Sequence, residues 1–230
     1  GSGEWKAAYC LTEPSSGSDA LAAKTVAHLT EDGAFYEITG QKMWISNAGF
    51  ADVFIVFAQV GGDKFTGFVV EGPCEGMTLG EEEDKLGIKG SSTRQVYFDK
   101  VKVPVGNVLG EVGRGHLIAF NTLNIGRFKL GTMCVGGIKE VTNMAAKYAN
   151  ERQQFKQSIS SFGAIQYKLA EMVIRSLAVE SSVYRTSELM NRYAEAKKAD
   201  GVDYGESKRS AAEEYAVECS IIKVAGSEAS

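Results

Sequence analysis

Cysteine, histidine and proline are all scarce in this sequence. Its 230 residues contain four cysteines, two histidines and three prolines. The cysteines are widely spaced and form no C-x-x-C pair, so we expect no metal site. Each cysteine is therefore interpreted as a small buried hydrophobe in a reduced, intracellular protein.

Excess positive charge and long hydrophobic runs are missing as well. Lysine and arginine total 25 against 29 acidic residues, which gives a net charge of −4. Nucleic acid is not the expected partner, because phosphate backbones are bound by basic surfaces. No apolar run approaches the roughly 20 residues that span a bilayer, and no secretory leader is visible. Membrane association is expected only through segments outside this sequence.

The first half of the chain has the pattern of a β domain. Hydrophobic residues make up 44% of the sequence, enough to bury a core. Up to about residue 112, short runs of β-branched and aromatic residues alternate with turn formers, which predicts an antiparallel sandwich or barrel. The expected strands are residues 6–11, 24–29, 35–46, 52–59, 65–70, 77–78 and 95–103.

The second half has helical periodicity. Apolar residues recur over residues 116–150 and again from Ile165 to Leu177, and a third expected helix runs from about residue 206 after a polar loop at 197–205. The fold class is therefore α+β. We predict a candidate cloning leader at residues 1–3, a β domain at 4–112 and part of a helical bundle at 113–230. The apolar helix stripes need further partners, so we expect a piece of a larger protein.

Two motifs lie in the β half. Residues 12–19, TEPSSGSD, concentrate hydroxyls and turn formers, and they fit either a polar turn or a loop that cradles an anion. In residues 42–49, KMWISNAG, Trp44 and Ser46 share one face of a strand. They fit either a planar-ring site or a core tryptophan beside an exposed serine. The glycine-rich residues 110–116 are interpreted as a flexible entry to the first helix.

Two more motifs lie in the helical half. Arg152 and Phe155 would share a helix face at i, i+3 spacing. There they could clamp a phosphate and stack on a base, or form a solvated helix end. Asn124 and Arg127 interrupt an apolar helix, so they either satisfy a packing defect or face a cleft.

The order of these motifs resembles the acyl-CoA dehydrogenase family. The matching peptides are YCLTEPSSGSD, WISN, DKLGIKGSST, VPVGNVLGEVGRG, GR, NERQQF and FGAIQYKLAEM. They cover essentially the whole chain and are most similar to the very-long-chain branch, including its relative that assists complex I assembly. The resemblance implies the family's middle β domain and part of its C-terminal helical domain, without its N-terminal domain.

The resemblance also implies an FAD site in the β half. Residues 9–18 match the loop that holds FAD, with Thr12 at the pyrimidine edge of the flavin and Ser18 at the pyrophosphate, near bound acyl-CoA. Trp44 would pack beside the flavin and Ser46 would lie near N5. The implied cofactor contacts of this half are Tyr9, Thr12, Ser18, Trp44, Ile45 and Ser46.

In the helical half, the resemblance implies substrate and subunit contacts. Asn124 and Arg127 match positions that line the acyl-CoA pocket, together with Ser18. Arg152 and Phe155 match residues that reach the FAD of a neighbouring subunit, which implies a homodimer or homotetramer. Electrons would pass to an electron-transfer flavoprotein, in the bacterial cytoplasm or the mitochondrial matrix.

The implied reaction is α,β-dehydrogenation of a long-chain fatty acyl-CoA, with hydride transfer to flavin N5, as in fatty acid β-oxidation. It needs a carboxylate base at the substrate's α carbon. In most members that glutamate lies on a loop that we expect beyond residue 230, and a few members carry it directly before the helix arginine, where this sequence has Gly126. We therefore name no catalytic residue and expect this chain to be inactive alone. The alternatives are a non-catalytic assembly protein on the same fold and an acyl-CoA oxidase.

Overall fold

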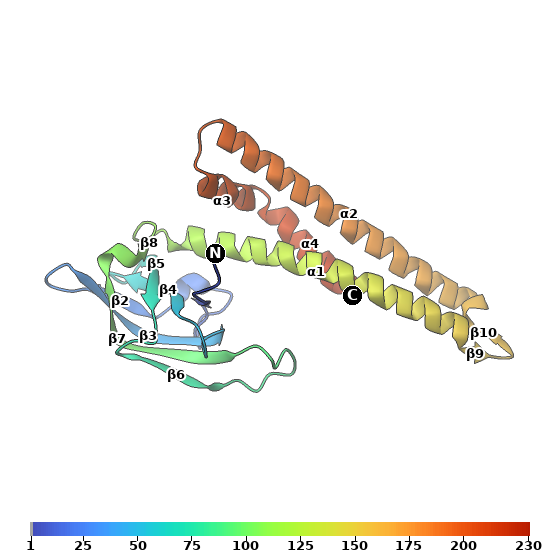
Figure 1. Ribbon diagram of the computed structural model, residues 1–230, viewed down its shortest axis with the longest axis horizontal. Helices are drawn as coiled ribbons and strands as arrows, with labels where there is room; N and C mark the ends of the chain where they lie inside the picture. The colour runs from blue at the N-terminus through green and yellow to red at the C-terminus, as the bar shows by residue number, and fades with distance from the viewer. Residues whose placement is uncertain (1) are drawn as a thin grey trace. The chain divides into compact units, whose positions relative to one another are not determined.

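The computed structural model describes residues 2–230. The chain folds as two compact units. The first, which ends at Ala119, is called the β unit, and the second, Phe120–Ser230, is called the helical unit (Figure 1). This α+β architecture confirms the predicted fold class. The boundary at residue 112 stays a prediction, because helix α1 (Gly115–Glu151) belongs to both units.

The described residues of the β unit form one eight-stranded sheet with the order β6-β7-β3-β2-β4-β5-β8, and β1 pairs with β4. All seven predicted strands are present, although β6 is longer than predicted and β8 was missed. The strands are β1 (Ala7–Cys10), β2 (Val26–Leu29), β3 (Phe35–Ser46), β4 (Val53–Val60), β5 (Lys64–Glu71), β6 (Met77–Glu82), β7 (Thr93–Pro104) and β8 (Val108–Leu109).

The pairing in this sheet is mostly antiparallel, as expected, with two exceptions. Strand β4 pairs in parallel with both β1 and β2. A parallel pair needs a long crossover connection, and the segments between these strands supply one. The sheet is therefore mixed. Alternating strands and turns in the sequence do not distinguish parallel from antiparallel pairing, so the two parallel pairs were not predicted.

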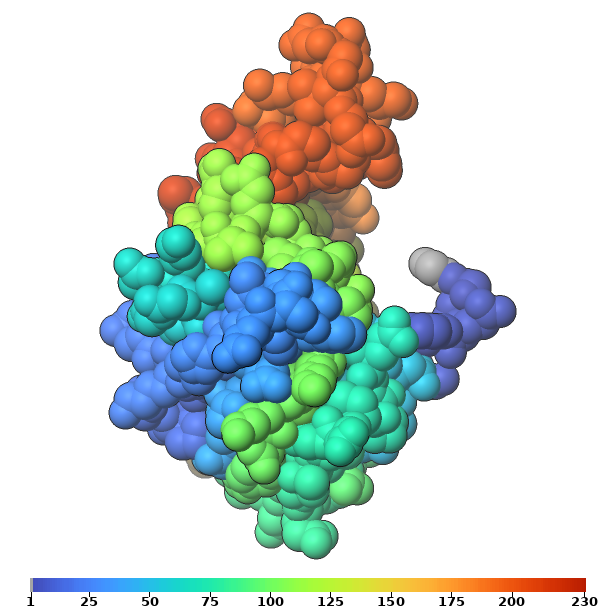
Figure 2. All heavy atoms as spheres, turned by 90° about the vertical axis from the view of Figure 1, so that its left-hand side faces the viewer, coloured from blue at the N-terminus to red at the C-terminus, as the bar shows by residue number. Residues whose placement is uncertain are grey.

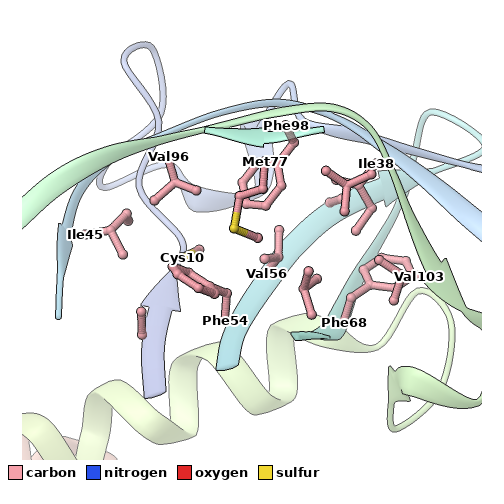
Figure 3. Close-up of a cluster of buried hydrophobic side chains, with 14 of the residues drawn as sticks. Cys10, Ile38, Ile45, Phe54, Val56, Phe68, Met77, Val96, Phe98 and Val103 are labelled. Atoms are coloured by element: carbon pink, nitrogen blue, oxygen red, sulfur yellow. The ribbon is translucent and has the colours of Figure 1, made fainter. Parts of the chain in front are cut away.

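Strand β4 lies at the centre of the hydrophobic core. Its alternating side chains point to opposite faces: Phe54 and Val56 join the large cluster on one face, and Phe57 joins a smaller cluster with Phe65 on the other. Figure 3 shows the large cluster, with side chains from β1, β3, β5, β6 and β7 converging on those of β4. Figure 2 shows the outer surface of this unit from one side, coloured from blue to green along the chain.

The helical unit contains the remainder of α1 and three further helices, α2 (Gly163–Ala199), α3 (Tyr204–Glu214) and α4 (Ala216–Ala229). Helices α1 and α2 converge toward residues 152–162, which connect them (Figure 1), and Lys139 of α1 pairs with Glu180 of α2. The prediction of one terminal helix was wrong, because the backbone breaks at Tyr215. The predicted loop at 197–205 is also shorter, since α2 continues to Ala199 and the Asp203 carboxylate caps α3 by accepting from Gly205 N and Glu206 N.

Helices α1 and α4 cross closely at a glycine. A Cβ atom added at Gly131 would stand 2.2 Å from Ile222 Cγ2, so no side chain fits there. Ile222 packs with Val179 and Val183 of α2 in the small buried cluster of this unit. Glycine at this position therefore sets how near the two helices approach.

Much of the apolar surface of the helical unit is uncovered in this chain. Of the predicted α2 stripe, Val173 and Leu177 are exposed. Exposed apolar side chains on α1 and α4 include Met133, Val141, Met144, Val217, Ile221 and Val224. No helix within residues 2–230 is long and apolar enough to cross a membrane. Among the four cysteines, Cys10 and Cys219 are buried as expected, whereas Cys74 and Cys134 are only half-buried.

Candidate functional site

The serine-rich loop after β1 is a closed turn. Glu13 and Ser16 exchange two backbone hydrogen bonds, of 2.9 and 3.1 Å. Ser16 Oγ donates to the carbonyl of Asp19 at 2.7 Å. The loop is thus internally bonded, while Ser18 is exposed at its surface. The Ser18 hydroxyl is therefore accessible to an external group.

A buried ion pair anchors this loop to the sheet. Lys42 Nζ, on β3, lies 2.8 Å from Glu13 Oε1 and also donates to the carbonyl of Leu11 at 3.2 Å. The Glu13 carboxylate further accepts from Lys24 N at 2.6 Å and Thr25 N at 3.0 Å. The Lys42 side chain is 0% exposed. Both charges are therefore paired and hydrogen-bonded, as buried charges must be.

The surroundings of Glu13 favour its charged form. Burial alone raises its pKa, but the Lys42 charge and the hydrogen bonds from Lys42 and the backbone outweigh this, so the pKa lies below its usual value. For Lys42, burial lowers the pKa, and Glu13 offsets part of that effect. Each partner of the pair therefore favours the charged form of the other.

Strand β3 bulges directly beside this loop. Lys42 pairs with Val96 and Ile45 with Arg94, so the strand carries one extra residue between these pairs. At the bulge, Trp44 has φ of +57° and its side chain is 62% exposed. A bulky residue with positive φ is a genuine outlier that surrounding structure must hold in place. Of the two alternatives for Trp44, the buried core tryptophan is therefore excluded.

The bulge and the loop are bonded to each other. Met43 N donates to the carbonyl of Thr12 at 2.9 Å. Trp44 and Ser46 are both exposed, whereas Ile45 between them is buried. The structure thus brings Thr12 next to the strand segment that presents Trp44 and Ser46, and any contact of Ile45 with a ligand is limited to its backbone.

Tyr9 lies on β1, shortly before the loop in the sequence. Its hydroxyl donates to the carbonyl of Ala119 at 3.1 Å, and its ring packs edge-on against Phe57. Burial raises its pKa above the usual range. Tyr9 therefore ties β1 to the start of α1 within the β unit.

Opposite Ser46, the carboxylate of Glu82 accepts hydrogen bonds from three consecutive residues, 92–94. We call this arrangement the Glu82 clasp. Ser46 pairs with Thr93 of β7, and Thr93 N donates to Glu82 Oε2 at 2.9 Å. Glu82 Oε1 accepts from Ser92 Oγ and Arg94 Nε, each at 2.7 Å. Hydrogen bonds from Ser92, Thr93 and Arg94 lower the pKa of Glu82 to about 2. The clasp stays charged at neutral pH.

In the helical unit, Asn124 and Arg127 are bonded to each other. Arg127 Nη1 donates to Asn124 Oδ1 at 2.7 Å, while Asn124 Nδ2 donates to the carbonyl of Ala212 at 3.3 Å. Ala212 lies in the last turn of α3, where carbonyls lack intrahelical donors. Asn124 is 5% exposed, whereas Arg127 is exposed. Asn124 therefore satisfies a helix end and orients the arginine, which alone remains accessible.

Arg152 and Phe155 are not on a helix, so their predicted helical spacing was wrong. Helix α1 ends at Glu151, and a hairpin of β9 (Gln153–Gln154) and β10 (Gln157–Ser158) follows (Figure 1). Its two-residue turn, Phe155 and Lys156, has positive φ at both positions, as such tight hairpins require. Phe155 is 80% exposed and contacts the ring of Phe162 edge-on. Arg152 is exposed just before the hairpin.

The two predicted sets in the helical unit lie far apart. Since an α-helix rises about 1.5 Å per residue, Glu151 lies about 36 Å from Arg127 along α1. The structure thus pairs Asn124 with Arg127 and places Arg152 beside Phe155, and it does not bring the two sets together. Within one chain they cannot touch the same ligand-sized group.

Sequence reasoning missed Glu13 and Lys42. Both belong to quoted motifs, TEPSSGSD and KMWISN, but charged residues are usually solvated, and nothing in the spacing signals burial. Among residues 2–230, no cluster of side chains could hold a metal ion.

Comparison with known protein families finds two family models that match this chain. The family model described as "Acyl-CoA dehydrogenase, middle domain" matches residues 8–101. The one described as "Acyl-CoA dehydrogenase, C-terminal domain" matches residues 113–229. Together they account for nearly the whole chain.

Individual relatives cover the chain from end to end. A Bacillus subtilis (strain 168) protein named "Probable acyl-CoA dehydrogenase" is 52% identical over 99% of this chain and 38% of its own length. The Homo sapiens "Very long-chain specific acyl-CoA dehydrogenase, mitochondrial" is 41% identical over 99% of this chain and 33% of its own length. A crystal structure described as acyl-CoA dehydrogenase complexed with FAD from Bacillus anthracis has a TM-score of 0.89 and 50% identity, covering 96% of this chain and 38% of that one. This chain thus spans little more than a third of these relatives.

Proposed function

Because this chain belongs to the acyl-CoA dehydrogenase family, we propose that the protein carrying it dehydrogenates a long-chain acyl-CoA thioester between its α and β carbons, with FAD as cofactor. The observation that carries the proposal is Trp44, a large aromatic ring held exposed on a positive-φ bulge beside the Thr12 loop. A strained, exposed aromatic next to accessible hydroxyls fits a planar ring system that packs against it. The very-long-chain relative supports the choice of substrate length.

The β unit would hold the cofactor. Thr12 would hydrogen-bond the pyrimidine edge of the flavin, Trp44 would pack beside the ring, and Ser46 and the Ile45 backbone would lie near N5. Ser18 would contact the pyrophosphate and the acyl-CoA, while Tyr9 would support the loop from β1. When bound, FAD supplies the acceptor for the hydride that leaves the β carbon.

The helical unit would contribute to the substrate pocket. Arg127 is accessible and fixed at one nitrogen by Asn124, so its remaining donors are free for a polar group of the CoA thioester. Asn124 is buried and both ends of its amide are used. We therefore assign Arg127 the direct contact and Asn124 the task of orienting it.

Arg152 and Phe155 would act on the FAD of another subunit. Their distance from Arg127 along α1 excludes them from a pocket shared with it in the same chain, and their exposure at a hairpin leaves them accessible to a neighbour. A homodimer or homotetramer would therefore complete each cofactor site. Electrons would then pass to an electron-transfer flavoprotein in a bacterial cytoplasm or mitochondrial matrix.

Removal of the α proton needs a carboxylate base at the substrate's α carbon. The position directly before Arg127 is Gly126, which has no side chain to supply such an acid. Glu151 lies at the far end of α1, and Glu171 is paired with Arg175 on α2. We therefore propose that these 230 residues alone do not dehydrogenate acyl-CoA.

The visible absorption spectrum of the purified protein tests the cofactor assignment. A bound flavin band is expected, and Trp44→Ala is expected to weaken FAD binding about tenfold, or about 1.4 kcal/mol. Trp5→Ala is the matched control, because Trp5 is equally exposed in the β unit but outside the proposed site. Equal FAD affinity in both variants would contradict the assignment.

Turnover tests the reaction. A full-length protein containing this sequence is expected to reduce electron-transfer flavoprotein with palmitoyl-CoA, whereas the 230-residue chain is expected not to. Peroxide release in place of acceptor reduction would indicate an oxidase. Flavin binding without turnover in the full-length protein would indicate a non-catalytic assembly role.

A further inference from the structure

The Glu13–Lys42 pair encloses one residue of the proposed cofactor site. Lys42 Nζ donates to the carbonyl of Leu11 and pairs with the carboxylate of Glu13, the two residues on either side of Thr12. Thr12 itself accepts from Met43 N, the residue after Lys42. Three consecutive residues of the loop are thus bonded to two consecutive residues of β3.

Stability alone does not explain a charged pair at this place. Replacing a buried ion pair by apolar residues of similar volume is often neutral or stabilising, because the desolvation penalty of the charges disappears. What the charges add is direction, since each hydrogen bond fixes the angle and distance of its partner. An apolar contact would hold the loop near β3 without fixing the orientation of its backbone.

The pair also reaches beyond the loop. The second oxygen of Glu13 accepts from Lys24 N and the first from Thr25 N, so the segment before β2 is held by the same carboxylate. Lys42 is the residue at which the β3 bulge begins, two positions before Trp44. One buried pair therefore connects the loop, the β2 entry and the bulge.

We propose that Glu13 and Lys42 are positioning residues that set the orientation of Thr12 relative to Trp44, and thereby the affinity and environment of the flavin. This inference rests on the proposed function for its flavin part. Its structural part, the alignment of the Met43 N–H with the Thr12 carbonyl, is independent of any cofactor. Neither residue touches the proposed flavin directly.

The test is a neutral double variant, Glu13→Gln with Lys42→Met, in the purified chain. Glutamine keeps an acceptor for Lys24 N and Thr25 N, and methionine keeps the length of the lysine stem, so no unpaired charge is buried. The matched control is Asp84→Asn with Lys89→Met, which removes an exposed ion pair of the same unit. Both variants are expected to unfold at a denaturant midpoint close to that of the wild type.

Two measurements distinguish a role in orienting Thr12 from a contribution to stability alone. In the double variant, hydrogen exchange at the Met43 amide of the flavin-free protein is expected to accelerate at least about tenfold, while β4 amides are unchanged. FAD affinity is expected to fall at least about tenfold, with an altered flavin absorption band. The control variant is expected to change neither.

The outcomes are distinguishable. Wild-type exchange at Met43 and wild-type FAD affinity in the double variant would overturn the inference. Faster Met43 exchange in a protein whose wild type binds no FAD would support the structural part and refute the proposed function instead. If the double variant does not fold, a second neutral pair, Glu13→Gln with Lys42→Leu, decides by the same two readouts, with unchanged values again overturning the inference.

Discussion

The β unit and the helical unit differ in how far their apolar and polar side chains are buried. In the β unit, phenylalanines of β4 and β5 are fully buried and even a lysine is enclosed with its partners. In the helical unit, valines, leucines and methionines of α1 and α2 face outward. The first unit can thus present a preformed surface by itself, whereas the second has apolar faces that suit contact with further protein.

The sharpest way to test this contrast is one substitution in two places. Phe57→Ala, at a 0% exposed position of β4, is expected to lower the free energy of unfolding by about 3–5 kcal/mol through lost burial and a cavity. Phe155→Ala, at the exposed hairpin, is expected to change it by less than about 0.5 kcal/mol. Chemical denaturation measures both. Equal effects would mean that the β unit is not the better packed of the two.

A smaller effect is expected where the helical unit is tightly packed. Gly131→Ala would push a methyl group against Ile222 and is expected to destabilise the protein by about 1–3 kcal/mol. Gly136→Ala, on the same helix with open space around it, is expected to be stabilising by up to about 1 kcal/mol. Thermal unfolding followed by circular dichroism checks the opposite signs. Two variants of the same sign would argue against a close α1–α4 crossing.

The buried amide of the helical unit should have an intermediate effect. Asn124→Ala leaves the Ala212 carbonyl without this donor and releases Arg127, so we expect a loss of about 1–3 kcal/mol in unfolding free energy. Asn143→Ala on an exposed part of α1 is the control and should be nearly neutral. In an active full-length protein, the Asn124 variant should also raise KM for acyl-CoA. An unchanged KM would mean that Arg127 needs no support from Asn124.

The smallest expected effect concerns acid sensitivity of the β unit. The pKa of Glu82 falls from 4.5 to about 2 in the folded state, so its clasp contributes stability above pH 4.5 that is lost as the pH drops toward 2. Wild type should therefore exceed Glu82→Gln in stability at pH 7, and the difference should vanish near pH 2. Denaturation at several pH values measures this difference. A pH-independent difference would show that the clasp does not depend on the carboxylate charge.

The sequence predicted the architecture better than the local geometry of the site. Strand and helix positions followed from the period of the apolar residues, and the family motifs were confirmed by the comparisons. The hairpin after α1 was misread because Arg152 and Phe155 happen to have i, i+3 spacing, and a positive φ at a phenylalanine has no sequence signal. The break at Tyr215 was missed for a related reason, since the apolar period continues through it.

The exposure of Trp44 and the burial of Lys42 are the reverse of what their residue types predict. A tryptophan is expected inside and a lysine outside, and the order is reversed here because a bulge redirects the strand while a carboxylate meets the ammonium group. Such inversions depend on partners far away in the sequence. They are therefore visible only in three dimensions, and they lie at the proposed cofactor site.

Helix α1 has one more consequence, which concerns its length. The residue proposed to contact one subunit's substrate and the residues proposed to reach another subunit's flavin are joined by an uninterrupted helix. In the proposed assembly, the length of this helix would fix the spacing between two cofactor sites. Inserting a single residue between Arg127 and Glu151 would turn the hairpin by about 100° and shift it by about 1.5 Å. In that proposed assembly, longer surface loops would leave the sites in place, whereas a change in the register of this helix would move the hairpin.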